Sequence, residues 1–203
     1  MKILLKISAF LLCALLLAAF LVLPATEAAY SGVYDKTLRF HVLANSDDPA
    51  DQQLKFHVRD GLVDYLSPFL ESCPDRAAAE SLLSSMLDQI EVKAREILLS
   101  EGSDLPVSVV LGKEYYPTRS YENLSYPAGV YQSLRVYLGK GEGQNWWCVA
   151  FPPLCLSPSS TASSLARAGY TDDEQSLVTQ KDEGYTVRFF ILDLAARIKE
   201  LFS

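Results

Sequence analysis

The spacing of hydrophobic residues changes near Gly102, and this change constrains the fold more than any other feature of the chain. Before it, apolar residues recur every three or four positions over residues 49–71 and 75–99, a pattern typical of amphipathic helices. After it, apolar and polar residues alternate over residues 107–111 and 134–138, a pattern typical of half-buried strands. The sequence therefore predicts an α+β domain.

Two more strands complete the predicted sheet. Residues 38–43 alternate and are rich in strand-forming residues, and residues 146–151 follow a glycine-rich turn at 139–143, which predicts a hairpin with the strand before it. We expect a mainly antiparallel sheet that two helices cover on one face. Residues 157–184 are predicted to be a polar linker or loop, followed by a C-terminal amphipathic helix at 185–203.

The N-terminus predicts export. Lys2 and Lys6 precede an apolar run at residues 7–23, and Pro24 and small residues follow it. This order is typical of a signal peptide at residues 1–28, cleaved after Ala28. The alternative is a retained N-terminal membrane anchor, because a run of about 17 residues lies at the lower limit for spanning a bilayer. In both cases the α+β domain, at residues 36–156, lies outside the cytoplasm.

The composition limits the kinds of partner and of cofactor that we expect for this chain. The chain has 18 basic and 25 acidic residues and a net charge of −7, so it has no electrostatic drive towards nucleic acid. The same charge weakly disfavours anionic lipid as a partner. His41 and His57 are the only histidines, and the cysteines form no paired Cys-x-x-Cys motif. We therefore predict no metal site and no other cofactor.

The segment at residues 141–155 contains Trp146, Trp147, Cys148 and Cys155. Indole rings and buried cysteines are strongly hydrophobic, so we expect this segment to form a dense, buried part of the scaffold. Cys148 and Cys155 are candidates for a disulfide, which an exported protein can keep. Two packed free thiols are the alternative.

Tyrosines cluster with an arginine between residues 115 and 131. Such residues are common at protein interfaces, because rigid amphipathic rings contribute contact area at low entropic cost. We predict a partner-binding surface here, and the alternative is a set of tyrosines that pack the rim of the core. The predicted contact residues are Tyr115, Arg119, Tyr121, Tyr126 and Tyr131.

An acidic turn precedes the first predicted helix and contains Asp47, Asp48 and Asp51. Helix capping explains it, with Asp47 or Asp48 as the cap and Pro49 at the first helical position. A pair of carboxylates for acid–base catalysis, or a calcium site, is the alternative. A third and a fourth calcium ligand are not evident in the sequence.

Two motifs resemble those of the stage II sporulation protein R family. The first runs from His41 to Asp47 and continues through residues 51–55 and 58–60, and the second covers residues 126–136 and 145–155. The resemblance extends over about residues 37–156. Within these motifs we expect a set of scaffold residues, namely Asn45, Asp47, Arg59, Asp60, Trp146 and Trp147.

The resemblance implies a signalling protein of endospore-forming bacteria. Such proteins are secreted from the forespore into the intermembrane space that faces the mother cell. There they activate a membrane-embedded aspartic protease, which processes the precursor of the mother-cell sigma factor sigma-E. We therefore expect this protease as the partner, no enzymatic activity, and membrane contact only through the N-terminal segment.

A second hypothesis is a secreted cell-wall hydrolase. It would use Asp47, Asp48 and Asp51 or Glu142 as acid–base groups, because these carboxylates are the plausible proton-transfer residues in the motifs. Replacing them with amides would separate the two hypotheses, since an enzyme would lose most of its activity and a binding protein would tolerate the change.

Overall fold

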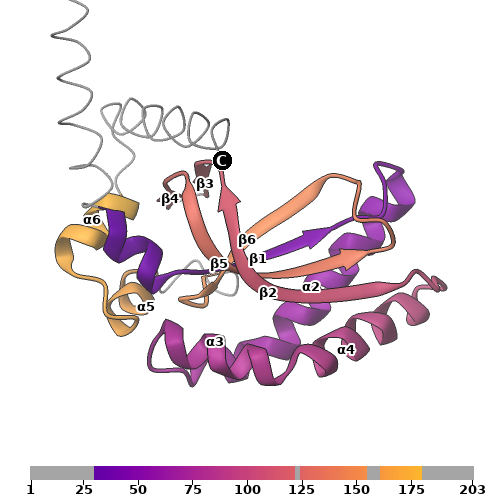
Figure 1. The fold of residues 1–203 in the computed structure, drawn as a ribbon, viewed down its shortest axis with the longest axis horizontal. Coiled ribbons are helices and arrows are strands. Elements are labelled where there is room, and N and C mark those ends of the chain that lie inside the picture. Colours follow the sequence, from indigo (N-terminus) through magenta and orange to yellow (C-terminus); the bar gives the residue numbers. More distant parts are fainter. Residues whose placement is uncertain (1–29, 122–123, 155–160, 180–203) are drawn as a thin grey trace, which may run out of the picture.

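The computed structural model describes residues 30–121, 124–154 and 161–179 (Figure 1). Residues 30–36 are helical. The elements that follow are β1 (Leu38–Leu43), α2 (Pro49–Glu71), α3 (Arg76–Ser85), α4 (Leu87–Ser100), β2 (Val107–Tyr116), β3 (Arg119–Ser120), β4 (Ser125–Tyr126), β5 (Gly129–Leu138), β6 (Asn145–Phe151), α5 (Thr161–Arg167) and α6 (Asp172–Thr179). This content confirms the predicted α+β class.

The main sheet has four strands in the order β2-β5-β1-β6, and β3 and β4 form a separate two-stranded sheet. β2 pairs with β5 and β1 pairs with β6 in antiparallel fashion, so the sheet is mainly antiparallel, as predicted. The predicted hairpin between β5 and β6 is wrong. β1 lies between these strands and pairs with β5 in parallel, and all six of its residues are buried, as suits a central position.

The helices begin where the sequence predicts. Asp48 caps α2 by accepting a hydrogen bond from the Ala50 amide at 2.9 Å, and Pro49 occupies the first position of the helix. The second predicted helix is two helices, α3 and α4, which meet at Met86 with a non-helical φ of −108°. Asp75 caps α3 through the Ala78 amide.

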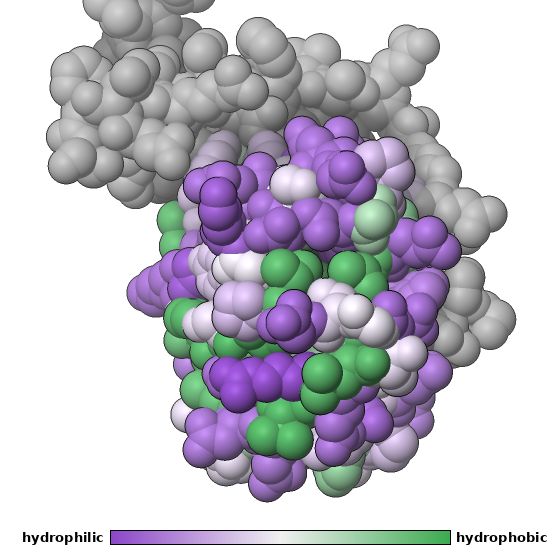
Figure 2. Space-filling view, turned by 90° about the vertical axis from the view of Figure 1, so that its right-hand side faces the viewer, coloured by the Kyte–Doolittle hydropathy of each residue, from purple (hydrophilic) through white to green (hydrophobic). Residues whose placement is uncertain are grey.

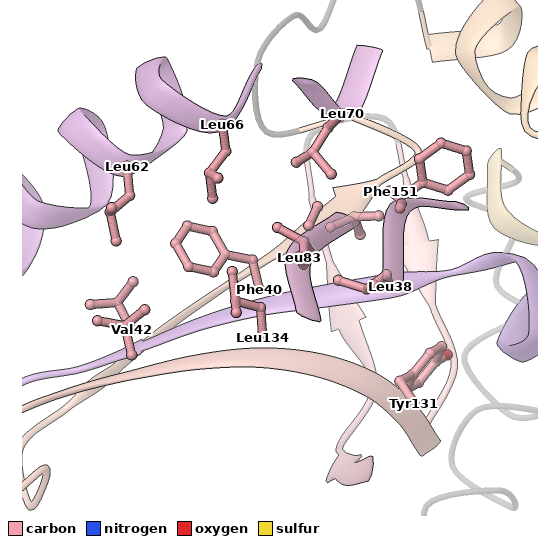
Figure 3. Close-up of a cluster of buried hydrophobic side chains, with 14 of the residues drawn as sticks. Leu38, Phe40, Val42, Leu62, Leu66, Leu70, Leu83, Tyr131, Leu134 and Phe151 are labelled. Atoms are coloured by element: carbon pink, nitrogen blue, oxygen red, sulfur yellow. The ribbon is translucent and has the colours of Figure 1, made fainter. Parts of the chain in front are cut away.

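The core lies between the sheet and the helices α2, α3 and α4 (Figure 1). Phe40 and Val42 of β1 point towards Leu62 and Leu66 of α2, and Figure 3 shows these side chains between the two layers. The four residues are at most 3% exposed. Burial of this apolar area is the main contribution to the stability of the layered structure.

The opposite face of the sheet is also covered, which the sequence analysis did not predict. Tyr34, in the helical residues 30–36, donates a hydrogen bond to the Ala128 carbonyl at 2.9 Å. The α5–α6 region contributes the buried side chains of Leu165, Tyr170 and Val178. The predicted linker at 157–184 therefore includes two short packed helices, because a few well-placed apolar residues anchor a mostly polar segment.

Three predicted features lie wholly outside the described residues, as do residues 157–160 and 180–184 of the predicted linker. They are the signal peptide or anchor at residues 1–28, the C-terminal helix at 185–203, and Cys155. Within residues 30–121, 124–154 and 161–179, no helix is both long enough and apolar enough to cross a membrane.

Candidate functional site

A fully buried arginine lies behind the sheet, on the face opposite α2. The guanidinium carbon of Arg39 lies 4.5 Å from the ring centre of Tyr116 and 5.3 Å from the ring centres of Tyr126 and Tyr131. The ring centre of Tyr121 is 5.8 Å away. We call these five residues the Arg39 cage. At these distances the negative faces of aromatic rings attract a cation.

The alternation of β1 explains how a charged residue comes to lie there. Phe40 and Val42 point towards the helices, so Arg39 and His41 point to the other side of the sheet. Arg39 Nη2 donates a hydrogen bond to the Tyr121 hydroxyl at 2.9 Å. Its Nε and Nη1 atoms have no hydrogen-bond partner in the part of the chain that the structure describes. The rings therefore supply much of the local stabilisation of this charge.

The tyrosines of the cage stay uncharged. Burial raises the pKa of Tyr121, Tyr126 and Tyr131, and the positive charge of Arg39 opposes this effect without cancelling it. Burial also raises the pKa of Tyr116, and the nearby Glu114 carboxylate adds to the rise. The cage therefore binds the cation through neutral rings and hydroxyl groups, not through a tyrosinate.

A chain of polar contacts borders the cage. His41 Nδ1 lies 2.9 Å from Glu114 Oε1, and the Ser133 hydroxyl donates to Glu114 Oε2 at 2.9 Å. The Tyr116 and Ser133 hydroxyl oxygens are 2.6 Å apart. Burial acts to raise the pKa of the Glu114 carboxyl, but the contacts with His41 and Ser133 outweigh it and hold the pKa below its ordinary value. Together these contacts fix the positions of the polar side chains on this face of the sheet.

The structure brings together three of the predicted contact tyrosines, but in the interior. Tyr126 and Tyr131 are 0% and 1% exposed, and the partly buried Tyr121 donates to the Trp147 carbonyl at 3.3 Å. These three follow the alternative that was left open, packing within the protein. Their contact with a partner has no support in this conformation.

The other two predicted contact residues are partly exposed. Tyr115 stands opposite Val130 in the sheet, so it points to the face away from its neighbour Tyr116. The guanidinium of Arg119 stacks on the ring of Trp147, 3.2 Å from its centre. Their role in partner contact stays a prediction.

Sequence reasoning missed Arg39 as the centre of the tyrosine cluster. The alternation of β1 placed Arg39 on the side of the sheet that one expects to face water. The available signal was a charge within a strand whose other residues are almost all apolar or aromatic. Only the cover over this face shows that the position is buried.

The first motif begins at one end of the sheet, beside the turn between β5 and β6. We call two segments there the motif loops: residues 44–52, which include the first turn of α2, and residues 139–144. Asp51 accepts hydrogen bonds from the Ser46 hydroxyl at 2.5 Å and from Asn45 Nδ2 at 2.8 Å. These hydrogen bonds lower the pKa of the Asp51 carboxyl, and the bond from Ser46 has the larger effect. Asp47 accepts from the Gln144 amide at 2.6 Å and so joins the two loops.

Two further hydrogen bonds from backbone amides join the same two segments. The Asn45 side-chain oxygen accepts from the Lys140 amide at 3.0 Å, and the Gly143 amide donates to the Ala44 carbonyl at 2.9 Å. A Cβ atom on Gly143 would lie 2.1 Å from the Ser46 carbonyl oxygen, so only glycine permits this approach. The carboxylates Asp47, Asp48 and Asp51 thus bind loop and helix groups, which favours the structural interpretation of the acidic turn.

The expected scaffold residues divide between two faces. Trp146 contacts Phe40 on the helix side, with ring centres 5.8 Å apart, whereas Trp147 contacts His41 on the other side, at 5.4 Å. Both indoles are only partly buried, so the prediction of one buried tryptophan cluster is wrong. Consecutive strand residues point to opposite faces, which explains the separation.

Arg59 and Asp60 lie on the outer side of α2. The Arg59 guanidinium lies 5.2 Å from the Trp146 ring centre and 4.7 Å from that of Phe56, and its Nε donates to Asp60 at 2.6 Å. The Asp60 side chain is 61% exposed.

The cysteines are partly described. Cys148 is bonded in a disulfide, and its partner lies outside the described residues. Cys155, the partner that the sequence suggests, is in that part of the chain. Cys73 is a free, partly buried thiol whose pKa burial raises. Among the residues that the structure covers, no group of three or more His, Cys, Asp or Glu side chains is arranged to hold a metal ion.

The comparisons with known proteins agree with the motifs. The family model of stage II sporulation protein R matches residues 34–161, which include the whole main sheet and α2 to α4. Stage II sporulation protein R of Bacillus subtilis (strain 168) is 33% identical over 190 residues, with 83% of each chain covered. No solved structure matches this chain. The chain belongs to the stage II sporulation protein R family.

Proposed function

We propose that this protein is an exported sporulation signal that activates a membrane-embedded aspartic protease by direct contact. The protease would then process the sigma-E precursor in the mother cell. The observation that carries the proposal is the family membership, which extends over most of the chain and the full sheet. The signal-like pattern of residues 1–28 supports export.

The environment of the acidic residues supports contact over catalysis. A general acid that works near neutral pH needs a raised pKa, and that of Asp51 is lowered by its hydrogen bonds. Asp47 and Asp48 accept hydrogen bonds from backbone amides, which hold the motif loops in place and cap α2. These contacts favour a binding protein over the alternative cell-wall hydrolase.

The test is reconstitution in a host that does not sporulate. The full chain, the protease and the sigma-E precursor are expressed together, and precursor cleavage is followed on immunoblots. We expect cleavage with the full chain and little cleavage without it. Equal cleavage in its absence would contradict activation by this protein.

A parallel assay addresses the hydrolase alternative. The purified protein is incubated with cell-wall peptidoglycan, beside variants Asp47→Asn and Glu142→Gln. We expect no soluble fragments from any of the three. Release of fragments by the wild-type protein, lost in both variants, would favour the enzyme.

A further inference from the structure

A cationic and aromatic surface lies on the outer side of α2, next to the start of β6. We call it the Arg59 surface, and it consists of Phe56, Arg59 and Trp146, with the buried Lys55 beneath them. The Arg59 guanidinium lies 4.7 Å from the ring centre of Phe56 and 5.2 Å from that of Trp146. The Arg59 side chain is 25% exposed and Phe56 is 39% exposed, so the surface is open to a partner.

The surface is held in position from below. Trp146 contacts the core residue Phe40 with its ring nearly perpendicular, at 83°. Lys55 Nζ donates to Gln52 Oε1 at 2.6 Å and to the Gln144 carbonyl at 3.0 Å, so the helix and the motif loops are joined beneath Phe56. Side chains fixed in this way lose little conformational entropy when a partner binds.

The arginine keeps donors for a ligand. Its Nε bonds to Asp60, whereas the Nη1 and Nη2 groups make no hydrogen bond or ion pair with a residue that the structure describes. Two terminal N–H groups in one plane match the two oxygens of a carboxylate. Arginine and tryptophan side by side are also the residue types that most often dominate binding energy at interfaces.

Charge indicates the kind of partner. The whole chain has a net charge of −7, but Arg59 presents a positive charge at this site, with a quarter of its side chain exposed. The ammonium group of Lys55 lies beneath it, and this residue is only 3% exposed. Burial lowers the pKa of Lys55, and the charge of Arg59 lowers it further, so the two cations lie close enough to repel each other, although the Asp47 carboxylate acts in the opposite direction. An incoming anion would relieve this repulsion. Asp60 neutralises only part of the charge, because its carboxylate lies on the Nε side.

The wider face fits a segment that also has apolar side chains. Figure 1 shows the start of α2 and the turn between β5 and β6 at the right-hand side of the molecule. Figure 2 looks onto that side, where hydrophobic residues gather between hydrophilic ones. Such a mixture is typical of the rim and core of a protein interface.

We infer that the Arg59 surface binds an acidic segment of a partner protein, with a carboxylate on Arg59 and apolar side chains on Phe56 and Trp146. The identity of the partner rests on the proposed function: it is the extracytoplasmic part of the membrane-embedded protease.

Photo-crosslinking tests this contact without depending on activation. Phe56 is replaced by benzoyl-phenylalanine in the full chain, which is co-expressed with the protease. Phe69, on the same helix and 40% exposed, is the matched control position. We expect an adduct with the protease from position 56, at least ten times stronger than from position 69.

Charge reversal tests the role of the guanidinium. Arg59→Glu should reduce both the adduct from position 56 and cleavage of the sigma-E precursor at least ten-fold. Arg95→Glu is the control, because Arg95 is a surface arginine of α4, paired with Glu91 at 2.5 Å and 52% exposed. It should change neither measurement. Equal accumulation and an unchanged melting temperature show that the variants fold.

The outcomes separate the two proposals. An adduct from position 56 without precursor cleavage would support the surface and contradict activation. Cleavage with no adduct from position 56, and unaffected by Arg59→Glu, would overturn the surface and leave activation standing. Neither adduct nor cleavage would overturn both.

Discussion

Arg39 and Arg59 both lie against aromatic rings, yet their surroundings differ in one decisive respect. Arg39 is fully buried on the central strand, with four tyrosine rings within 6 Å of its guanidinium. Arg59 lies on an outer helix between Phe56 and Trp146, with a quarter of its side chain exposed. A guanidinium group packed against aromatic rings is therefore buried in one place and partly exposed to solvent in the other.

Burial determines whether an arginine of this kind stabilises the fold or is available to bind a partner. A buried charge has lost its hydration, so its neighbours must stabilise it and the folded state depends on them. A partly hydrated arginine contributes little to folding, but its free donors can bind a second molecule. The Arg39 cage is thus expected to hold the protein together, and the Arg59 surface to make contacts.

The largest effect is expected for Arg39→Ala. It removes a large side chain from the centre of the cage and leaves a cavity, so the free energy of unfolding should fall by about 3–5 kcal/mol. Urea unfolding followed by tryptophan fluorescence measures it. Arg39→Met is the control, because a flexible apolar chain fills much of the space without a buried charge, and it should cost clearly less. A loss below about 1 kcal/mol for Arg39→Ala would show that the cage is not a stabilising element.

Glu114→Gln should destabilise the protein by about 1–3 kcal/mol, because a neutral amide replaces the charged group that contacts both His41 and Ser133. The effect should depend on pH. Since the folded-state pKa of Glu114 lies below its ordinary value of 4.5, its contribution is present above pH 4.5 and is lost as pH falls through the folded-state pKa. Urea unfolding at a series of pH values from neutral to acid measures both effects.

In that series the wild-type protein should lose stability on acidification more steeply than Glu114→Gln. Asp51 has a lowered pKa in both proteins and adds the same slope to each. Parallel curves for the two proteins would show that Glu114 is not held in its charged form.

Gly143→Ala should lower the free energy of unfolding by about 1–3 kcal/mol, because the added methyl group would lie against the Ser46 backbone and push the motif loops apart. Gly112→Ala is the matched control on β2, where the new Cβ would meet only the end of the Arg135 side chain at 3.3 Å. Melting temperatures compare the two. Equal shifts would mean that the loop junction yields easily and does not hold the Arg59 surface in place.

The smallest effect on folding is expected for Arg59→Ala. A partly exposed cation on two aromatic rings contributes up to about 1 kcal/mol, so the unfolding free energy should change by no more than this. Urea unfolding, as for Arg39→Ala, is the measurement. A loss as large as that of Arg39→Ala would remove the distinction between the two arginines and make Arg59 a structural residue.

Local patterns were enough to predict much of the fold. Helical spacing located α2, and Asp48 with Pro49 marked its start, because capping is decided by neighbouring residues. Alternation located the long strands of the sheet. The break at Met86 and the short helices α5 and α6 were not predicted, since a helix can stop or continue according to what packs against it.

The candidate sites were less accessible to such reasoning. The resemblance placed Asn45, Asp47 and Arg59 in one motif, but spacing along the chain did not show that Phe56 and Trp146 flank the arginine. The tyrosine cluster was recognised, whereas its position around Arg39 was not. Contacts between residues far apart in the chain depend on strand order, and β1 entered the sheet between β5 and β6.

Periodicity, caps and motifs are properties of nearby residues, so the types of element, their approximate limits and the family could be predicted from the sequence. Which arginine is enclosed and which is open depends on the three-dimensional arrangement. Exposure depends on what covers each face of the sheet, and the cover over Arg39 comes from β3, β4 and segments more distant in the chain. Alternation along β1 could place that side chain on a face, but it could not show that the face is covered.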